Sequence, residues 1–290
     1  MSFFRYPGGK RKLRHIIVER LETEIVKMSS RFEYREPFFG GGGIGLMLAK
    51  QIHLDRLWIN DKDIGIACLW TAIMRCPELL KKHILGFIPS IDAFDRFSFS
   101  LRNEHPDMED YDSLAYFGFM KLAVHQLSYS GLGLKSGGPL GGRQQSSPYK
   151  IDCRWSPLYI CKKIDMIHKE LMSSKIHGDK CWSLDFQDVI DNKDNGMALM
   201  YVDPPYYDKG NNLYHVGFSE QDHIRLAECL RATRHRWVLS YDACPRILAL
   251  YYWAKIERLS VNYSITAVGK TDEDKSSRWK YEYIITQPNS

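Results

Sequence analysis

The 290-residue sequence has no apolar run long enough to span a membrane, and hydrophobic residues make up an ordinary 44% of it. Its first residues, MSFFRYPGGK, lack the apolar stretch of a secretory signal. The seven cysteines include no CxxC pair, and such a set indicates a reducing compartment rather than a disulfide framework. We therefore expect a cytoplasmic protein without a membrane partner.

Metal-ligand patterns and repeats are also missing. The ten histidines, His215 and His223 among them, do not recur at the spacing of a ligand cluster, so no metal site is expected. We find no internal repeat and no low-complexity tail. A chain of this length can bury one good core with a second lobe inserted into it.

The net charge of +5 is small, but it is unevenly distributed. Residues 121–163 contain seven Lys or Arg and one acid, so this stretch carries +6 and the rest of the chain about −1. Tyrosines, a tryptophan and many glycines lie between these cations. Cations mixed with aromatic residues are typical of surfaces that bind phosphates and unstacked bases, although a solvated loop would have the same composition.

The hydrophobic pattern predicts alternating helices and strands. Helical spacing covers residues 11–28, and helical patterns dominate from Ile64 to about Ser174, where strands are scarce. Ser219 is well placed to cap another helix. Strand-like runs are FEYREPFF, RLWIND, SKIHG, ALMYVD, RWVLSYD, KIERLSV and KYEYIITQ. This order predicts an α/β fold, a mostly parallel sheet with helices on both faces, an antiparallel edge hairpin and a mainly helical insertion.

Ligands of such sheets bind beyond the carboxyl ends of the strands, and four strand-end corners stand out. The glycine-rich corner EPFFGGGGIG covers residues 36–45, where the backbone could approach a ligand closely. Asp61 ends the next strand and could accept hydrogen bonds from ribose hydroxyls, although a helix cap would look the same. Asp185 and Phe186 could bond to and stack on an adenine-like ring.

The fourth corner, Asp203-Pro204-Pro205-Tyr206, is the most informative. The prolines fix the backbone and remove its donors, so the Asp203 carboxylate and the Pro204 carbonyl become rigid neighbouring acceptors. Two such acceptors suit an exocyclic amino group, which has two hydrogens to donate. Tyr206 supplies a flat face for the ring that carries this amine.

These motifs together resemble the Dam family (D12 class) of DNA adenine-N6 methyltransferases. The resemblance rests on YPGGK at 6–10, EPFFGGGG at 36–43 and DPPY at 203–206, in the order found in that family. It implies a Rossmann-like methyltransferase sheet, residues 1–64 and 175–290, that binds S-adenosylmethionine. It also implies that residues 65–174 form an inserted target-recognition domain for double-stranded DNA, in a monomer or weak dimer.

The resemblance assigns roles to individual residues. It implies that Asp203, Pro204, Pro205 and Tyr206 are catalytic, and that Lys10 pairs with the methionine carboxylate of the donor. The residues that it implies for donor binding are Tyr6, Pro7, Gly8, Gly9, Lys10, Glu36, Pro37, Phe38, Gly40, Gly42, Asp61, Asp185, Phe186 and Asp203.

The chemistry expected of this corner needs neither a metal nor a cysteine nucleophile. An adenine amine is conjugated with its ring and attacks the sulfonium methyl only when its lone pair is withdrawn from that conjugation. Asp203 and the Pro204 carbonyl would favour the pyramidal amine by accepting its N–H groups. The target base must leave the duplex and stack on Tyr206 to reach them.

DNA contacts are expected from the basic insertion. Family members carry an Arg-Asn-Gly loop in this region, whereas this chain has HQLSYSGLGLKSGGPLGGR, so the target sequence cannot be carried over. We expect Ser130, Lys135 and Arg143 to contact DNA. Three other classes stay open. The first is methylation of cytosine N4, of RNA adenine or of protein amines; the second is a non-catalytic DNA-binding relative; the third is a nicotinamide oxidoreductase, although the DPPY corner has no role in hydride transfer.

Overall fold

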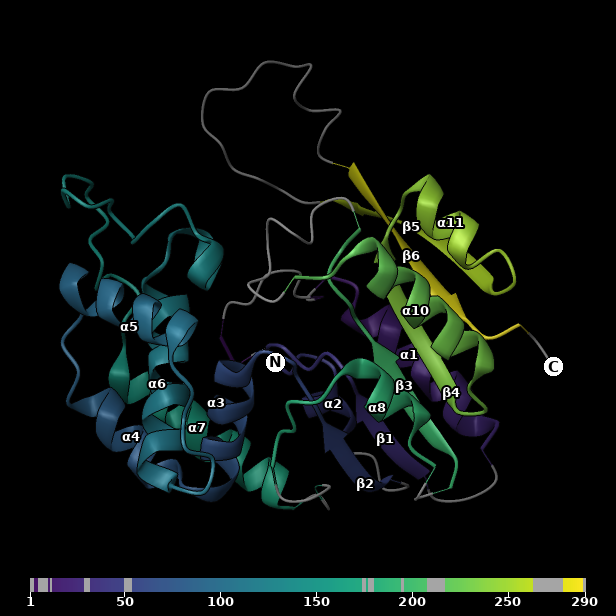
Figure 1. The fold of residues 1–290 in the computed structure, drawn as a ribbon, viewed down its shortest axis with the longest axis horizontal. Helices are drawn as coiled ribbons and strands as arrows, with labels where there is room; N and C mark the ends of the chain where they lie inside the picture. The colour runs from purple at the N-terminus through teal and green to yellow at the C-terminus, as the bar shows by residue number, and fades with distance from the viewer. Residues whose placement is uncertain are drawn as a thin grey trace.

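The computed structural model describes residues 3–4, 10, 12–28, 32–49, 54–173, 176, 180–193, 196–207, 217–262 and 279–288. Within this part of the chain the fold is mixed α/β, built around a six-stranded sheet with the order β2-β1-β3-β4-β6-β5 (Figure 1). The strands are β1 (Phe32–Glu36), β2 (Leu54–Ile59), β3 (Ala198–Val202), β4 (Arg236–Asp242), β5 (Lys255–Asn262) and β6 (Trp279–Thr286).

Strand directions place four strand ends together. Strand β1 runs parallel to β2 and β3, and β3 runs parallel to β4, so all four end at the same edge of the sheet. Strand β6 pairs antiparallel with β4 and with β5, which confirms the predicted hairpin and puts β5 at the outer edge.

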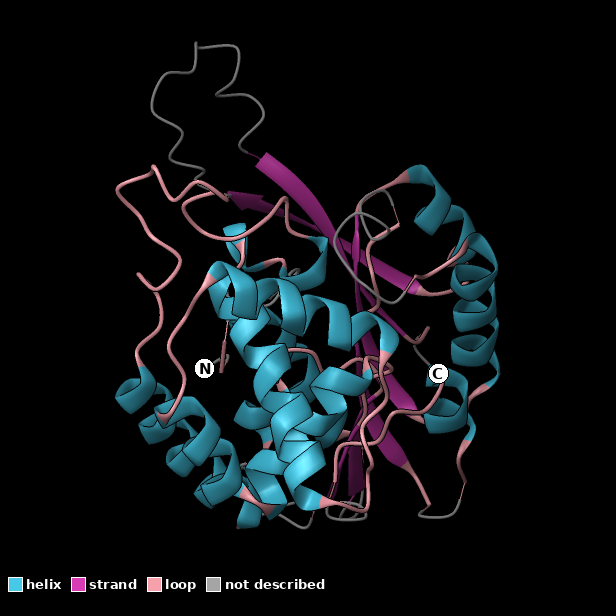
Figure 2. Cartoon of the chain, turned by 60° about the vertical axis from the view of Figure 1, so that its left-hand side comes forward, coloured by secondary structure: helices cyan, strands magenta, loops and turns pink. Residues whose placement is uncertain are grey.

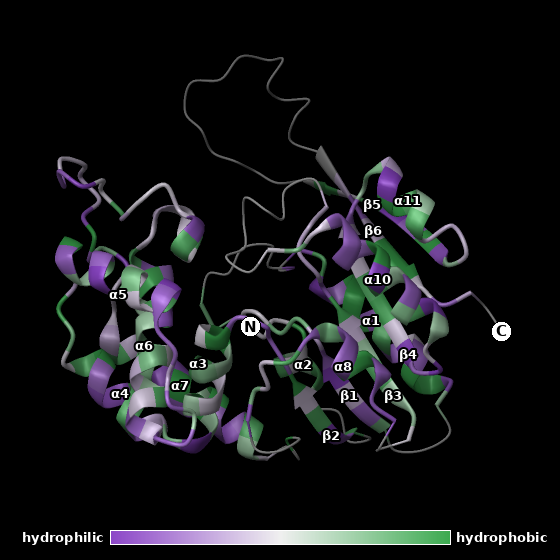
Figure 3. Ribbon diagram, viewed as in Figure 1, coloured by the Kyte–Doolittle hydropathy of each residue, from purple (hydrophilic) through white to green (hydrophobic). Residues whose placement is uncertain are grey.

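Helices cover both faces of the sheet, as the sequence predicts. Along β3, Leu199 and Tyr201 join the core on the side of α1 (Arg14–Val26), whereas Met200 and Val202 face the opposite core. Three helices pack on that second face: α8 (Phe186–Asp191), α10 (Glu220–Ala232) and α11 (Pro245–Leu250). In Figure 3, α10 alternates between hydrophobic and hydrophilic residues, as expected for a helix with one face on the sheet.

A group of helices lies between β2 and β3 in the order of the chain. It consists of α3 (Ile64–Arg75), α4 (Pro77–Leu85), α5 (Ile91–Asn103), α6 (Tyr111–Leu127) and α7 (Pro157–Met172). Helix α6 is its centre and packs against α3, α4 and α5. The group lies beside the sheet in Figure 1 and in front of it in Figure 2. The helix-rich character predicted from Ile64 onward is thus confirmed.

Element boundaries differ from the predictions at a few places. The first helix covers 14–26 rather than 11–28, and the glycine corner leads into a helix of one turn, α2 (Gly45–Leu48). The SKIHG run lies mostly outside the described residues, and its Ile176 forms only an isolated parallel bridge with Leu57. Ser219 caps α10 as expected, in a capping box with Asp222.

The glycine-rich stretch after α6 does not continue the helix. It forms two short 3-10 turns, Tyr129–Gly131 and Gly133–Lys135, and Ser130 has a φ of 58°. Ser128 holds the turn together, because its hydroxyl accepts the Gly133 amide hydrogen and donates to the His125 carbonyl. No helix in the described part of the chain is long and apolar enough to cross a membrane.

Candidate active site

The first two strand ends, at β1 and β2, are connected by backbone and side-chain hydrogen bonds. The Asn60 amide donates to the Glu36 carbonyl over 3.0 Å, and the Phe39 amide donates to the Asn60 carbonyl over 2.8 Å. The buried Asn60 side chain also donates to the carbonyls of Pro37 and Leu184. One asparagine therefore connects the glycine corner to the segment that precedes α8.

The glycine corner is held from the side of the helical group. Trp70 on α3 donates its indole N–H to the Gly40 carbonyl over 2.8 Å. At Gly42, with φ +66°, an added Cβ would lie 2.8 Å from the Trp70 ring. An added Cβ at Gly43 would meet nothing within 4 Å. Packing thus requires glycine at Gly42, whereas the backbone at Gly43 borders open space.

Asp61 keeps the same turn in place. One of its carboxylate oxygens accepts the Gly40 amide hydrogen over 2.7 Å, and the other accepts that of Asp63 over 3.0 Å. Burial, followed by the charge of Asp63, raises the pKa of Asp61 to about 7. The cap of α3 is Asp63 and not Asp61, so the alternative reading of Asp61 as a helix cap is wrong.

Glu36 is a second buried carboxyl group beside the glycine turn. It accepts a 2.5 Å hydrogen bond from the Tyr34 hydroxyl and another from the Gly45 amide. An added Cβ at Gly45 would lie 2.9 Å from the Glu36 carboxylate. Burial raises the pKa of Glu36 to about 8. This carboxyl group therefore holds its proton far more readily than an exposed glutamate does.

The DPPY corner at the end of β3 forms a compact polar cluster. The Lys10 ammonium lies 2.6 Å from Oδ1 of Asp203 and donates to the Tyr206 hydroxyl over 2.9 Å. Ser240 on β4 donates to the same Oδ1 over 2.9 Å, and its hydroxyl also bonds to that of Tyr201. Lys10 and DPPY, 193 positions apart, are thus parts of one site.

Charges in this cluster compensate one another. Burial would lower the pKa of Lys10, but the charges of Asp203, Tyr206 and Glu282 outweigh it and raise that pKa well above its usual value. Burial raises the pKa of Asp203, which Lys10 and Ser240 counteract. The Asp203 side chain is still 20% exposed. A carboxylate held on one oxygen and reachable from outside can accept a hydrogen bond from a ligand.

The fourth strand end, at β4, supports the loop after the prolines. The Tyr207 amide donates to an Asp242 oxygen over 2.8 Å. Tyr207 also packs beside His223 of α10, with ring centroids 5.0 Å apart. Pro204 is buried, whereas Pro205 and Tyr206 are partly exposed, so the tyrosine ring can offer a surface to a ligand.

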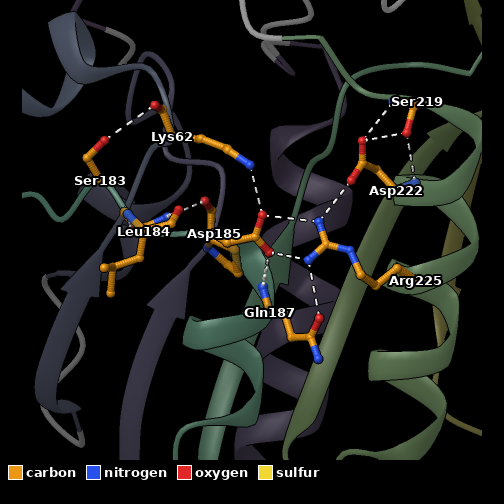
Figure 4. Close-up of polar contacts among 10 residues, drawn as sticks. Lys62, Ser183, Leu184, Asp185, Gln187, Ser219, Asp222 and Arg225 are labelled. Atoms are coloured by element: carbon orange, nitrogen blue, oxygen red, sulfur yellow. Dashed lines mark hydrogen bonds and ion pairs between the residues drawn. The ribbon is translucent and has the colours of Figure 1, made fainter.

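Asp185 is the centre of an ion-pair network (Figure 4). It caps α8, and its oxygens accept hydrogen bonds from Arg225 at 2.6 and 3.1 Å and from Lys62 at 2.9 Å. Burial opposes ionisation of Asp185, but Arg225, Lys62 and the Gln187 amide lower its pKa to about 2. Its carboxylate is therefore charged at any physiological pH.

Aromatic rings adjoin this network. Phe38 from the glycine corner stacks on Phe186, with centroids 5.7 Å apart, and Phe218 lies within 5.8 Å of both. The Arg225 guanidinium covers the Phe186 ring at 4.3 Å from its centroid. Phe186 is buried and Phe38 only partly so, which leaves Phe38 as the ring that a planar ligand could contact.

The structure brings most of the predicted site residues to one edge of the sheet. Lys10, Glu36, Pro37, Phe38, Gly40, Gly42, Asp61, Asp185, Phe186 and Asp203 to Tyr206 all lie at or beside the four strand ends. Tyr6, Pro7, Gly8 and Gly9 lie outside the described residues. The contact of Lys10 with a donor carboxylate stays a prediction, since its ammonium is placed on Asp203 and Tyr206.

The residues predicted to contact DNA lie elsewhere, in the glycine-rich loop after α6. Ser130 and Lys135 are exposed. Arg143 is exposed too, and its guanidinium forms a two-point ion pair with Asp95 of α5 at 2.9 and 3.0 Å. Their role in DNA binding stays a prediction.

Sequence reasoning missed four side chains of this site: Lys62, Arg225, Ser240 and Glu282. Lys62 and Arg225 are ordinary surface cations in sequence, and only the fold brings them to Asp185. Ser240 and Glu282 interrupt the otherwise apolar strands RWVLSYD and YEYIIT. A polar residue inside a buried strand was therefore the available signal for these two.

In the parts of the chain that the structure describes, no group of three or more His, Cys, Asp or Glu side chains could hold a metal ion. Residues 6–265, most of the chain, match the family described as D12 class N6 adenine-specific DNA methyltransferase. A comparison with curated proteins gives no match.

Proposed function

Because the chain belongs to the D12 class of N6 adenine-specific DNA methyltransferases and so methylates adenine in DNA, we propose that its donor is S-adenosylmethionine, bound at the four strand ends. The observation that carries this proposal is the clustering of Lys10, Ser240 and Tyr206 on Asp203 at the end of β3. The sheet serves as the Rossmann-like donor-binding domain, residues 1–64 and 175–290.

The residues at these strand ends fit such a donor. The partly exposed Phe38 ring, beside Phe186, offers an aromatic surface for a purine. Asp61 lies next to the turn that borders open space at Gly43, so its oxygens can also accept hydrogen bonds from ribose hydroxyls. The carboxylate of Asp203 favours a cationic ligand nearby.

Bound there, the donor supplies an electrophilic methyl group on a sulfonium. The protein's part is to hold and orient the adenine amine. Lys10 and Ser240 both donate to Oδ1 of Asp203, so an incoming N–H is directed to Oδ2. The Pro204 carbonyl accepts the second N–H, and the Tyr206 ring stacks on the base. An amine held in this way keeps its lone pair on nitrogen for attack.

Asp203 can do this only as a carboxylate. Burial raises its pKa, and the Lys10 ammonium and Ser240 hydroxyl offset only part of that rise. When the pH falls below the pKa of Asp203, the protonated oxygen no longer accepts strongly and transfer slows. Activity should therefore have an acid limb that reports this carboxyl.

Residues 65–174 form the target-recognition domain in this proposal. The loop after α6 carries the exposed side chains of Ser130 and Lys135, and the basic excess of the chain lies in residues 121–163. Such cations bind phosphates and position the duplex, while the target adenine swings out toward Tyr206. We propose that the protein acts in the cytoplasm as a monomer or weak dimer on double-stranded DNA.

The experiment is methyl transfer from isotopically labelled S-adenosylmethionine to duplex DNA, followed by digestion and mass spectrometry of the nucleosides. The expected product is labelled N6-methyladenine. Labelled N4-methylcytosine would assign the amine to cytosine instead and contradict the proposal. A calorimetric titration with the donor, and with NAD as the matched control, should give binding of the first only.

A further inference from the structure

Glu282 is a carboxylate without a part in the proposed hydrogen bonds to the target amine. It lies on β6, directly opposite Asp242 in the antiparallel pairing with β4. Only 3% of its side chain is exposed. A buried carboxylate in a sheet is costly unless a positive charge lies close by, and such groups gather at functional sites.

The positive charge beside Glu282 is Lys10. The ammonium lies 3.9 Å from Oε2 of Glu282 and 2.6 Å from Oδ1 of Asp203. Its own side chain is 3% exposed. Two carboxylates thus face one buried ammonium, so each receives less of its charge than it would as the sole partner.

The Glu282 carboxylate beside the shared Lys10 ammonium affects the pKa of Asp203. Burial is the main cause of the raised pKa of Asp203; Lys10 and Ser240 lower this pKa, and the charge of Glu282 raises it. Other groups that face the cluster are the phenols of Tyr201, Tyr206 and Tyr241 and the carboxyl of Glu36. Glu36 is the one carboxyl among these groups, and it does not lie within 4 Å of Lys10 as Glu282 does.

We propose that Glu282 is a positioning residue for methyl transfer: it shares the Lys10 ammonium with Asp203 and so keeps Asp203 a strong acceptor for the target amine. This inference rests on the proposed function. An ammonium given to Asp203 alone would hold the carboxylate more tightly and weaken its hydrogen bond to the adenine N–H. Glu282 thereby links the antiparallel edge of the sheet to the catalytic corner.

The test compares the full-length protein with Glu282→Gln, which keeps the shape of the side chain and removes its charge. Single-turnover transfer to duplex DNA at saturating donor is measured across pH. We expect the plateau rate to fall about fivefold, within the range of coupling in one polar network. We expect the acid limb to move to lower pH, by ~0.5 unit, because a raising influence on Asp203 is lost.

Two further variants make the result specific. Glu257→Gln removes a carboxylate from the same hairpin, on β5, where it pairs with Arg20 of α1. This variant should leave the plateau rate of transfer and the acid limb of the pH profile unchanged. Glu282→Asp shortens the side chain by one methylene and so moves its charge away from Lys10. We expect the acid limb to shift in the same direction as in Glu282→Gln, but by less. Glu282→Asp also provides the test if Glu282→Gln does not fold, as judged by circular dichroism.

An acid limb that stays in place or moves to higher pH in a folded Glu282 variant overturns the inference, as does an unchanged plateau rate. The wild-type protein is assayed first for labelled N6-methyladenine. If it forms none, the proposed function fails; if it forms the product and the variants behave like wild type, only the role of Glu282 fails.

Discussion

The DPPY corner at the end of β3 and the glycine-rich loop after α6 differ in how far their ion pairs are exposed to solvent. In the corner, Lys10 and Asp203 are 2.6 Å apart with side chains 3% and 20% exposed. In the loop, Arg143 is 66% exposed and its partner Asp95 is 43% exposed. Buried charges are little screened by salt, whereas exposed ones are screened within about 10 Å at 0.1 M.

This difference fits the two tasks in the proposed function. A paired, mostly buried carboxylate has a fixed position and a tuned proton affinity, which chemistry on a weakly basic amine requires. Exposed cations on a loop exchange partners easily, which suits contacts with a phosphate backbone. Substitutions in the corner should therefore change the rate and its pH dependence, and those in the loop should change DNA affinity and its salt dependence.

The largest expected effect comes from Asp203→Asn. The amide keeps the shape of the side chain and can still accept from Lys10 and Ser240, but it lacks the negative charge that the proposed function places beside the target amine. We expect the rate of transfer to fall by a factor on the order of 1,000. Rapid-quench measurement with labelled donor checks this.

The matched control is Asp188→Asn, the same change at an exposed carboxylate of α8. It should transfer at the wild-type rate. Turnover by Asp203→Asn within tenfold of wild type would mean that the corner does not hold the amine.

Lys10→Met should have the next largest effect. Lys10 lowers the pKa of Asp203, so without it burial raises that pKa further and a larger fraction of the carboxyl is protonated at neutral pH. We expect transfer at pH 7 to fall ~100-fold and to recover partly as the pH is raised, because Asp203 then ionises.

Donor binding to the same variant separates two roles of Lys10. A donor dissociation constant close to wild type, with the shifted pH profile, assigns the lysine to Asp203. If instead affinity is lost while the pH profile stays in place, Lys10 binds the donor carboxylate, as the sequence resemblance implies.

Arg225→Gln tests whether the ion pairs of Asp185 support the aromatic surface formed by Phe38 and Phe186. The arginine holds Asp185 with two hydrogen bonds and covers the Phe186 ring. We expect donor affinity to fall about fivefold through loosening of that aromatic surface. Isothermal titration measures it, with Arg231→Gln on the same helix as the control.

The same substitution changes stability at acid pH. The pKa of Asp185 is lowered from 3.8 to about 2, so its ion pairs stabilise the fold above pH ~4 and are lost as the pH falls toward 2. Arg225→Gln should remove part of this stabilisation at neutral pH and little of it at pH 2. Equal destabilisation at both values would show that packing, not charge, is responsible.

The smallest effects are expected in the loop. Lys135→Ala should weaken DNA binding a few-fold and lower the slope of log K against log salt by about 1. Arg143→Ala should do less, because Asp95 already pairs with the guanidinium. Fluorescence anisotropy over a salt series distinguishes the two variants. A loss of transfer rate at saturating DNA would contradict the assignment of DNA binding to the loop and of chemistry to the DPPY corner.

The loop also offers a gain of function. Asp95→Ala frees Arg143 for a phosphate, so DNA affinity should rise and the salt slope should steepen. No change in either quantity would place Arg143 outside the DNA contact surface.

Much of the fold follows from the sequence. Six of the seven predicted strand runs contain strands at the expected places, and the seventh, SKIHG, lies mostly outside the described residues. The helix-rich segment and the Ser219 cap follow as well. Local periodicity and capping chemistry act within a few residues, so a sequence contains them in full.

Asp203-Pro204-Pro205-Tyr206 and the glycine corner were equally visible in sequence, because rare residue combinations mark them. Tertiary structure alone decided the partners of these residues: that Lys10 lies on Asp203, that Arg225 and Lys62 hold Asp185, and that Glu282 approaches Lys10 from β6. Such contacts join residues far apart in the chain. Their strength depends on burial and distance, which arise only when the strands come together in one sheet.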